Sequence, residues 1–132
     1  MSYHIEKLQF GDSPKMADKL LRLVLNGTKT ATCSALKEYK DGDEPIPTVG
    51  KKSIILDGGG TPRCMIETTQ VDIRKFSEVD AAFAYAEGEG DRSLDYWQKE
   101  HKRFFEGSGY FSPDMELICE YFQVIREYDF SI

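Results

Sequence analysis

The stretch KSIILDGGGTPRCMIETTQVDI, residues 52–73, decides the fold class of this chain. Lys52 to Asp57 is a short run built on isoleucine and leucine, and Arg63 to Ile73 is a second run whose alternate residues form two faces. Glycines 58–60 make a tight turn between them. Two strand-like runs joined by a glycine-rich turn predict an antiparallel β-hairpin.

The segments around this hairpin predict a chain in which strands cluster. Ser13-Pro14 is a typical helix start and Asn26-Gly27 a typical helix end. In chain order, we expect a helix from Ser13 to Gly27, a strand from Thr28 to Ser34, a loop from Lys37 to Gly50, the hairpin, helices from Glu78 to Ala86 and from Leu94 to Glu106, and a last strand or strand pair from Met115 to Tyr128. Strands that do not alternate with helices favour an α+β fold with a small, strongly curved sheet or barrel.

The composition limits the classes of partner. A length of 132 residues is common for one domain, so we expect residues 1–132 to form a single domain. The formal net charge is -6, whereas proteins that hold long nucleic acids by their phosphates are usually basic. Any contact with RNA should therefore be short, local and focused on a base or nucleoside. We expect no double-stranded DNA partner.

Cysteine usage and hydropathy favour a cytoplasmic protein. The three cysteines, Cys33, Cys64 and Cys119, are odd in number and form no C-x-x-C pair, so we expect free thiols in a reducing compartment. The N-terminal sequence has no apolar segment of the signal-peptide kind. No apolar run approaches the roughly 18 residues of a membrane span, so we expect no membrane partner.

The sequence predicts no metal site and no cofactor. Its potential metal ligands are scattered along the chain: Cys33, Cys64, Cys119, His4 and His101. The segment 27–30, Gly-Thr-Lys-Thr, lacks the earlier glycine of a phosphate-binding P-loop. The carboxylates that surround glycines 88 and 90 would repel a dinucleotide pyrophosphate.

The helix predicted from Leu94 carries an apolar stripe of five residues, which are Leu94, Trp97, His101, Phe104 and Phe105. Trp97, Phe104 and Phe105 are expected to lie in the core, because they recur at helical spacing. His101 lies on the same stripe, so we expect a packing histidine rather than a catalytic one.

Two segments carry more polar chemistry than simple turns require: Thr28-Lys-Thr-Ala-Thr32 and Glu87-Gly-Glu-Gly-Asp91. A threonine hydroxyl becomes a nucleophile when a base takes its proton, and a lysine with a lowered pKa can be that base. A carboxylate would position the lysine or transfer protons. Lys29 and Thr32 can share a site only if the chain turns or bulges between them. Spacing alone favours a plainer alternative, a solvated lysine and carboxylates that stabilise a helix N-terminus.

The same residues resemble a known family. The string Leu25-Asn-Gly-Thr-Lys-Thr-Ala-Thr32, followed by a hairpin and by Phe83-Ala-Tyr-Ala-Glu-Gly-Glu-Gly-Asp-Arg-Ser-Leu-Asp-Tyr-Trp97, is similar to the longer bacterial branch of the ASCH-domain family, over about Leu20 to Ile125. The resemblance implies a small PUA-like β-barrel with flanking helices around a central cleft. It also implies a role in RNA binding or RNA metabolism, and some members are hydrolases of N4-acetylcytidine or of RNA.

The resemblance also implies site residues. By the Gly-x-Lys-x-x-Thr turn, Lys29 corresponds to the lysine and Thr32 to the threonine of the amidohydrolase members, and Glu89 or Glu87 to their downstream glutamate; we prefer Glu89. Small members usually have an arginine after the turn, where this chain has Cys33-Ser34. Further candidates for binding are Thr28, Thr30, Glu87, Tyr39, Arg63 and Arg92.

Two functions therefore remain open. The first is a hydrolase of a modified nucleoside or short RNA, with Lys29 as base, Thr32 as nucleophile and Glu89 as the positioning or proton-transfer group. The second is a non-catalytic module for single-stranded RNA, in which Lys29 binds phosphate and aromatic side chains stack on bases.

Overall fold

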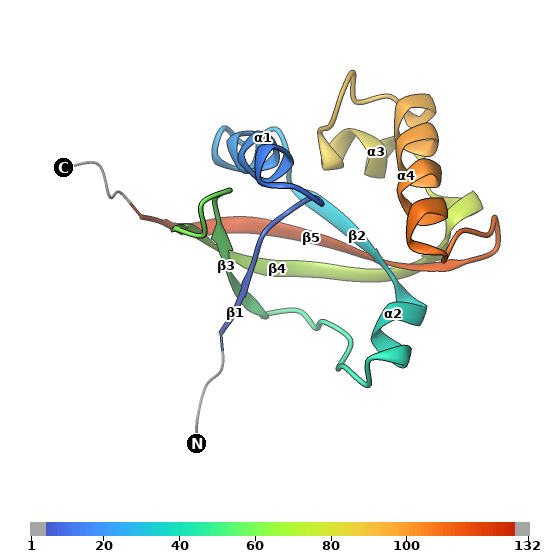
Figure 1. Cartoon of the computed structure of the whole chain (residues 1–132), viewed down its shortest axis with the longest axis horizontal. Helices are drawn as coiled ribbons and strands as arrows, with labels where there is room; N and C mark the ends of the chain where they lie inside the picture. The colour runs from blue at the N-terminus through green and yellow to red at the C-terminus, as the bar shows by residue number, and fades with distance from the viewer. Residues whose placement is uncertain (1–4, 129–132) are drawn as a thin grey trace.

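A computed structural model describes residues 5–128, which form one five-stranded sheet with four α-helices (Figure 1). The elements in chain order are β1 (Glu6–Leu8), α1 (Pro14–Leu25), β2 (Ala31–Ala35), α2 (Leu36–Asp41), β3 (Lys52–Leu56), β4 (Pro62–Lys75), the 3-10 turn η1 (Phe76–Glu78), α3 (Ala81–Glu87), α4 (Leu94–Ser108) and β5 (Glu116–Glu127). Among these described helices, none is long and apolar enough to cross a membrane.

The predicted hairpin is the centre of the sheet. The strand order is β1-β3-β4-β5-β2, with β1 parallel to β3 and every other pair antiparallel. The register between β4 and β5 shifts at Met65/Ile66 and again at Thr68/Gln70. Such bulges increase the twist of long strands, and the sheet is curled into a half-barrel (Figure 1). The expected α+β class with a strongly curved sheet is confirmed.

Helix α1 begins and ends where its caps predict. The Ser13 hydroxyl accepts a hydrogen bond from the Met16 amide at 3.1 Å, and Pro14 is the first helical residue. The next strand starts at Ala31, three residues later than predicted. The amides of Thr28 and Lys29 both donate to the carbonyl of Leu23, each at 2.9 Å. These bonds extend the helix end as a turn and keep both residues out of the sheet.

The predicted loop from Lys37 to Gly50 is wrong in its first part, because α2 occupies Leu36–Asp41. Leu36 is buried and anchors this short helix against the sheet, and Gly42 ends it. The last strand is one continuous strand, β5, rather than a pair. Helices α3 and α4 are confirmed to within two or three residues at each end.

The helices divide the core into two clusters. In Figure 1, α1 and the α3–α4 pair lie along the same side of the long strands β4 and β5, and α2 lies beyond the end of β2. One cluster joins α1 to β3, β4 and β5, and its largest members are Phe10, Leu20, Leu21, Ile55, Ile66 and Phe122. The other joins α3 and α4 to β2 and β5 around Phe76, Phe83, Trp97, Phe105 and Leu117. The candidate site lies in space between α1 and α4, and residues of both helices line it.

Candidate functional site

The loop after α3 lies directly on the turn that precedes β2. Gly88 has a φ of +75°, and a Cβ atom there would lie 2.5 Å from the carbonyl oxygen of Thr28. The left-handed conformation favours glycine, and the close approach of the two backbones leaves no room for a Cβ atom. The Thr30 amide donates to the Ala86 carbonyl at 2.7 Å and extends the contact. The two segments that stand out in the sequence are therefore one structural unit.

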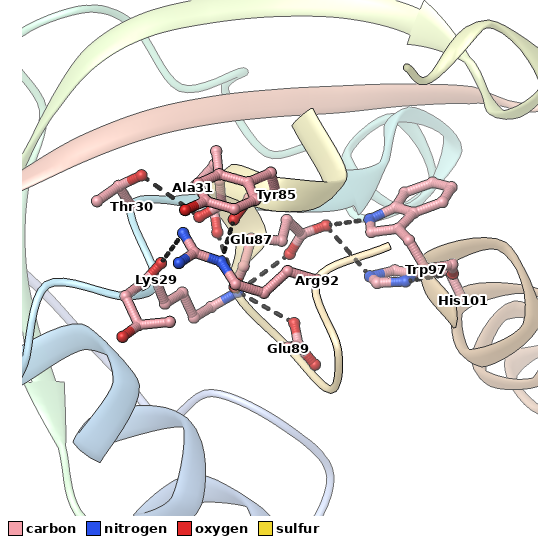
Figure 2. Close-up of polar contacts among 11 residues, drawn as sticks. Lys29, Thr30, Ala31, Tyr85, Glu87, Glu89, Arg92, Trp97 and His101 are labelled. Carbon is pink, nitrogen blue, oxygen red and sulfur yellow. Dashed lines mark hydrogen bonds and ion pairs between the residues drawn. The ribbon is translucent and has the colours of Figure 1, made fainter. Parts of the chain in front are cut away.

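Arg92 fastens this unit. Its guanidinium donates to the carbonyls of Tyr85 at 3.0 Å and Thr28 at 3.2 Å, and it stacks over the Tyr85 ring at 3.5 Å (Figure 2). Arg92 itself has a φ of +66°, which is uncommon for a residue with a side chain. Its donors are used to hold the loop against the turn.

Lys29 lies at the centre of the unit and is only 2% exposed. Its ammonium donates to the Ala31 carbonyl at 2.9 Å and to carboxylate oxygens of Glu87 at 3.0 Å and Glu89 at 3.2 Å (Figure 2). Three protons are thus matched by three close acceptors. Burial alone lowers the pKa of Lys29, but the charges of Glu87 and Glu89 outweigh burial and raise the pKa above its ordinary value. Lys29 is an ammonium ion in this arrangement.

Glu87 is equally buried and fully engaged. One carboxylate oxygen accepts from Lys29, and the other accepts from the Trp97 indole at 2.6 Å and faces Nε2 of His101 at 3.2 Å. Burial opposes the ionised form, but the charge of Lys29 and the hydrogen bond from His101 hold the pKa of Glu87 well below its usual range. Glu87 is therefore ionised, and both of its carboxylate oxygens accept hydrogen bonds within the buried network.

His101 links the network to α4. Its Nδ1 lies 2.9 Å from the Trp97 carbonyl oxygen, and its Nε2 faces the Glu87 carboxylate. Both partners accept hydrogen bonds and cannot donate them, so both ring nitrogens carry protons. Burial lowers the pKa of His101, but the hydrogen bond and charge of Glu87 outweigh it and raise the pKa. The ring also stacks on Trp97 with centroids 4.2 Å apart. His101 is thus more than the packing residue that its position on the stripe predicts.

A pocket of about 140 Å³ opens beside this network, at the junction of the two core clusters. Lys29 and Thr32 both line it, although they are three residues apart. The chain turns before Ala31, and this turn is the condition under which the sequence allows Lys29 and Thr32 to share a site. Glu87, Glu89 and His101 line the same pocket. Glu89 is the more accessible carboxylate, with its side chain 24% exposed against 2% for Glu87.

The family model described as the ASCH domain matches residues 6–126. The chain belongs to the ASCH domain family. Members of this PUA-like family are associated with RNA. The resemblance predicted from the two sequence strings, and the PUA-like α+β fold that it implies, are both confirmed.

Solved structures agree with this assignment. A protein from Enterococcus faecalis V583 is 43% identical, with a TM-score of 0.88 over 97% of this chain and 80% of its own. An ASCH domain from Lactobacillus crispatus JV V101 is 34% identical, with a TM-score of 0.87 over 93% of this chain and 80% of its own. An ASCH protein from Zymomonas mobilis, at 12% identity and a TM-score of 0.55 over 96% of this chain and 74% of its own, shares the fold alone. No curated protein matches the chain.

Several residues that the sequence proposes for this ASCH site lie elsewhere. The Tyr39 hydroxyl accepts a hydrogen bond from the Ser34 hydroxyl at 3.2 Å, and Tyr39 lines other hollows, beside α2. Arg63 pairs with Asp57 at 3.5 Å, at the hairpin turn. The pocket lining does not include Thr28, Thr30 or Arg92, which instead join the loop after α3 to the turn before β2.

The pocket also contains residues that sequence reasoning misses. Phe104 was expected in the core but is 47% exposed, and it lines the pocket. Glu100 and Arg103, one turn of α4 apart, form an ion pair of 2.8 Å at the same opening. Their spacing on the helix could have indicated the pair, but nothing in the sequence places α4 beside α1.

Among the described residues, one group has the composition of a metal site. Potential ligand atoms of Cys33, Glu87 and His101 lie within 4.8 Å of one another. The prediction that all potential ligands are scattered is therefore wrong for Cys33 and His101. His4 lies outside the described residues. A metal ligand needs a free lone pair. The acceptors of Glu87 are engaged, and the ammonium of Lys29 lies 3.0 Å away and opposes a second cation. Burial and the charge of Glu87 raise the pKa of the Cys33 thiol well above its ordinary value.

Proposed function

We propose that this pocket hydrolyses an amide on a modified nucleoside, of the N4-acetylcytidine kind. The observation that carries the proposal is the buried ion network of Lys29, Glu87 and Glu89 beside the hydroxyl-bearing Thr32 in one pocket. Burying charged groups costs several kcal/mol each, and such networks concentrate at functional sites. The family's association with RNA supports a nucleoside-like ligand.

The geometry favours a different division of roles from the one drawn from sequence. Lys29 keeps its proton because two carboxylates hold it, so the base is better assigned to Glu89. In this mechanism Glu89 takes the proton of Thr32 as its oxygen attacks the amide carbonyl, and Lys29 holds the Glu89 carboxylate in place through their hydrogen bond. Glu89 then gives the proton to the leaving amine. Water, deprotonated by Glu89, breaks the resulting ester and regenerates Thr32.

The structure supports the alternative, a non-catalytic RNA-binding module, less well than it supports the hydrolase. It needs Lys29 to bind phosphate, but Lys29 is 2% exposed and its three protons already face three acceptors. RNA cleavage with Lys29 as the phosphate-stabilising group meets the same obstacle. Both remain outcomes of the experiment below rather than the favoured function.

The test is a turnover assay with N-acylated cytidines and a short unstructured RNA, followed by chromatography and mass spectrometry. We expect release of cytidine and the free acid. Thr32→Val and Glu89→Gln should each lower kcat by about 10²-fold or more, the range of general acid–base contributions. Thr69→Val, an exposed threonine on β4, is the matched control and should retain full activity.

Each other outcome decides against the proposal. Turnover that survives both Thr32→Val and Glu89→Gln would place the chemistry elsewhere. RNA fragments with intact acyl-cytidine would replace the amidohydrolase with a nuclease. No turnover, with saturable and salt-sensitive RNA binding, would favour the binding module.

A further inference from the structure

Phe104 is a large aromatic side chain that lies outside the hydrophobic core. It is 47% exposed, whereas its neighbour Phe105 is 3% exposed. The two rings meet edge to face, with centroids 5.4 Å apart. Phe105 therefore holds Phe104 at the pocket, whose lining includes both rings. An exposed ring that is fixed by a buried one is a suitable surface for stacking a planar ligand.

The charges around the pocket do not suit a phosphate. Its lining contains four carboxylates, those of Asp12, Glu87, Glu89 and Glu100. Each lining cation is already paired with one or two of them: Lys29 with Glu87 and Glu89, and Arg103 with Glu100. Even with a protonated His101, negative charges outnumber positive ones, so an anionic group would meet net repulsion.

One polar group of the lining that remains available to a ligand is an acceptor, the Glu89 carboxylate. Glu89 uses one carboxylate oxygen for Lys29, and its side chain is 24% exposed. A carboxylate has lone pairs for further hydrogen bonds and no proton to give. A ligand edge with N–H donors, such as an amide or an exocyclic amine, would donate hydrogen bonds to the Glu89 carboxylate.

The size of the pocket admits one ring. A volume of about 140 Å³ is below the roughly 300–1,000 Å³ that encloses a drug-sized molecule. The sugar and any phosphate of a nucleotide would therefore stay at the opening, beside Asp12 and the Glu100–Arg103 pair.

We propose that Phe104 determines specificity by stacking on one uncharged, planar heterocycle that carries N–H donors, while the carboxylates of the opening reject phosphorylated forms. This inference rests on the proposed function for the location of the ligand and deepens it by naming the ligand's charge, shape and contact residue. It makes the free nucleoside the preferred ligand over its 5′-phosphate.

The test is calorimetric titration of the purified chain with N4-acetylcytidine and with its 5′-monophosphate. Phe104→Leu keeps apolar bulk but removes the aromatic face, and Ile125→Ala is the control, because Ile125 is similarly exposed, at 42%, and lies outside the pocket lining. We expect Phe104→Leu to weaken nucleoside binding at least tenfold, within the range of base–aromatic stacking. The 5′-phosphate should bind no more tightly than the nucleoside at low salt.

Tighter binding of the monophosphate, or unchanged nucleoside affinity in Phe104→Leu, would overturn the inference. The turnover assay separates the two proposals. Hydrolysis that depends on Thr32 and Glu89 but has an unchanged KM in Phe104→Leu would leave the hydrolase intact and reject the stacking role. Binding that depends on Phe104 without any turnover would keep the inference and reject the hydrolase.

Discussion

At the scale of single residues, the site is a balance of buried charges. Lys29 and Glu87 are each 2% exposed and 3.0 Å apart. Removing both charges of a buried pair is often neutral for stability, but removing one leaves the other unpaired in a medium of low dielectric. The buried network therefore places a strong constraint on Lys29 that is independent of catalysis.

We predict that Lys29→Met lowers the free energy of unfolding by about 3–5 kcal/mol, because it removes the buried ammonium that pairs with both Glu87 and Glu89 and leaves His101 as the remaining cation beside Glu87. Urea denaturation measures the change. The double variant Lys29→Met/Glu87→Gln removes one charge of each sign, so it should lose less stability than Lys29→Met alone. A double variant whose loss equals the sum of the single losses would show that the two side chains do not interact.

His101 gives the network a pH dependence. Its folded pKa is raised, chiefly because the Glu87 carboxylate outweighs burial. A raised folded pKa stabilises the fold fully below the unfolded value of about 6.5, and this contribution is lost as pH rises through the folded pKa. We predict an imidazole midpoint above 6.5 in an NMR titration, shifted downward by Glu87→Gln. His4→Asn assigns the two histidine signals.

Stability should follow the same sign. The difference in unfolding free energy between the wild type and His101→Asn should be largest below pH 6.5 and narrow in more alkaline solution. A difference that widens with rising pH would mean that the neutral imidazole is the preferred form. That result would contradict the proton positions assigned from the Trp97 carbonyl and the Glu87 carboxylate.

At the scale of elements, the loop between α3 and α4 positions the carboxylates. Gly88→Ala would place a Cβ 2.5 Å from the Thr28 carbonyl oxygen in a left-handed conformation. We predict a loss of about 1–3 kcal/mol in unfolding free energy, together with weakened ligand binding, because Glu89 would move from Lys29. Gly107→Ala is the matched control, since a Cβ there meets nothing within 4 Å. It lies in α4 and should be neutral or stabilise by up to about 1 kcal/mol.

The elements also show what sequence can predict. Helix α1 and the hairpin follow from local caps and turns, so both are predicted correctly. Helix α2 is missed because its six residues depend on the burial of one side chain, Leu36. Phe104 and Phe105 differ by about 100° around α4. Both rings line the pocket, but packing in the core cluster of α3 and α4 buries Phe105 and leaves Phe104 exposed, which the spacing on the helix does not predict.

The sequence predicts the location of the candidate site but not the protonation states of its residues. The unusual strings around Lys29 and Glu89 predict one shared candidate site, and Lys29 and Glu89 do line one pocket. The protonation of Lys29 depends on how many carboxylates surround it, which is a property of the tertiary fold. The same holds for His101, whose partner Glu87 comes from another helix.

At the scale of the whole molecule, charge restricts how RNA can bind. The formal net charge is -6, and the cations at the pocket are paired with carboxylates. A protein that follows an RNA backbone neutralises many phosphates and releases their counterions, which makes affinity fall steeply with salt. This chain lacks that surplus of positive charge, so recognition should depend on one base rather than on the length of the strand.

We predict that unstructured oligonucleotides of four and twelve nucleotides with the same acetylated cytidine bind with nearly equal affinity per modified base. Added nucleotides bring phosphates that find no unpaired cation at the pocket, so they contribute little. For single strands, the slope of log affinity against log salt is about −0.7 for each phosphate neutralised, and a slope near zero is expected here. Fluorescence anisotropy measures both quantities. A steep slope that grows with length would show that basic side chains contact the RNA backbone. That result would favour the non-catalytic RNA-binding module.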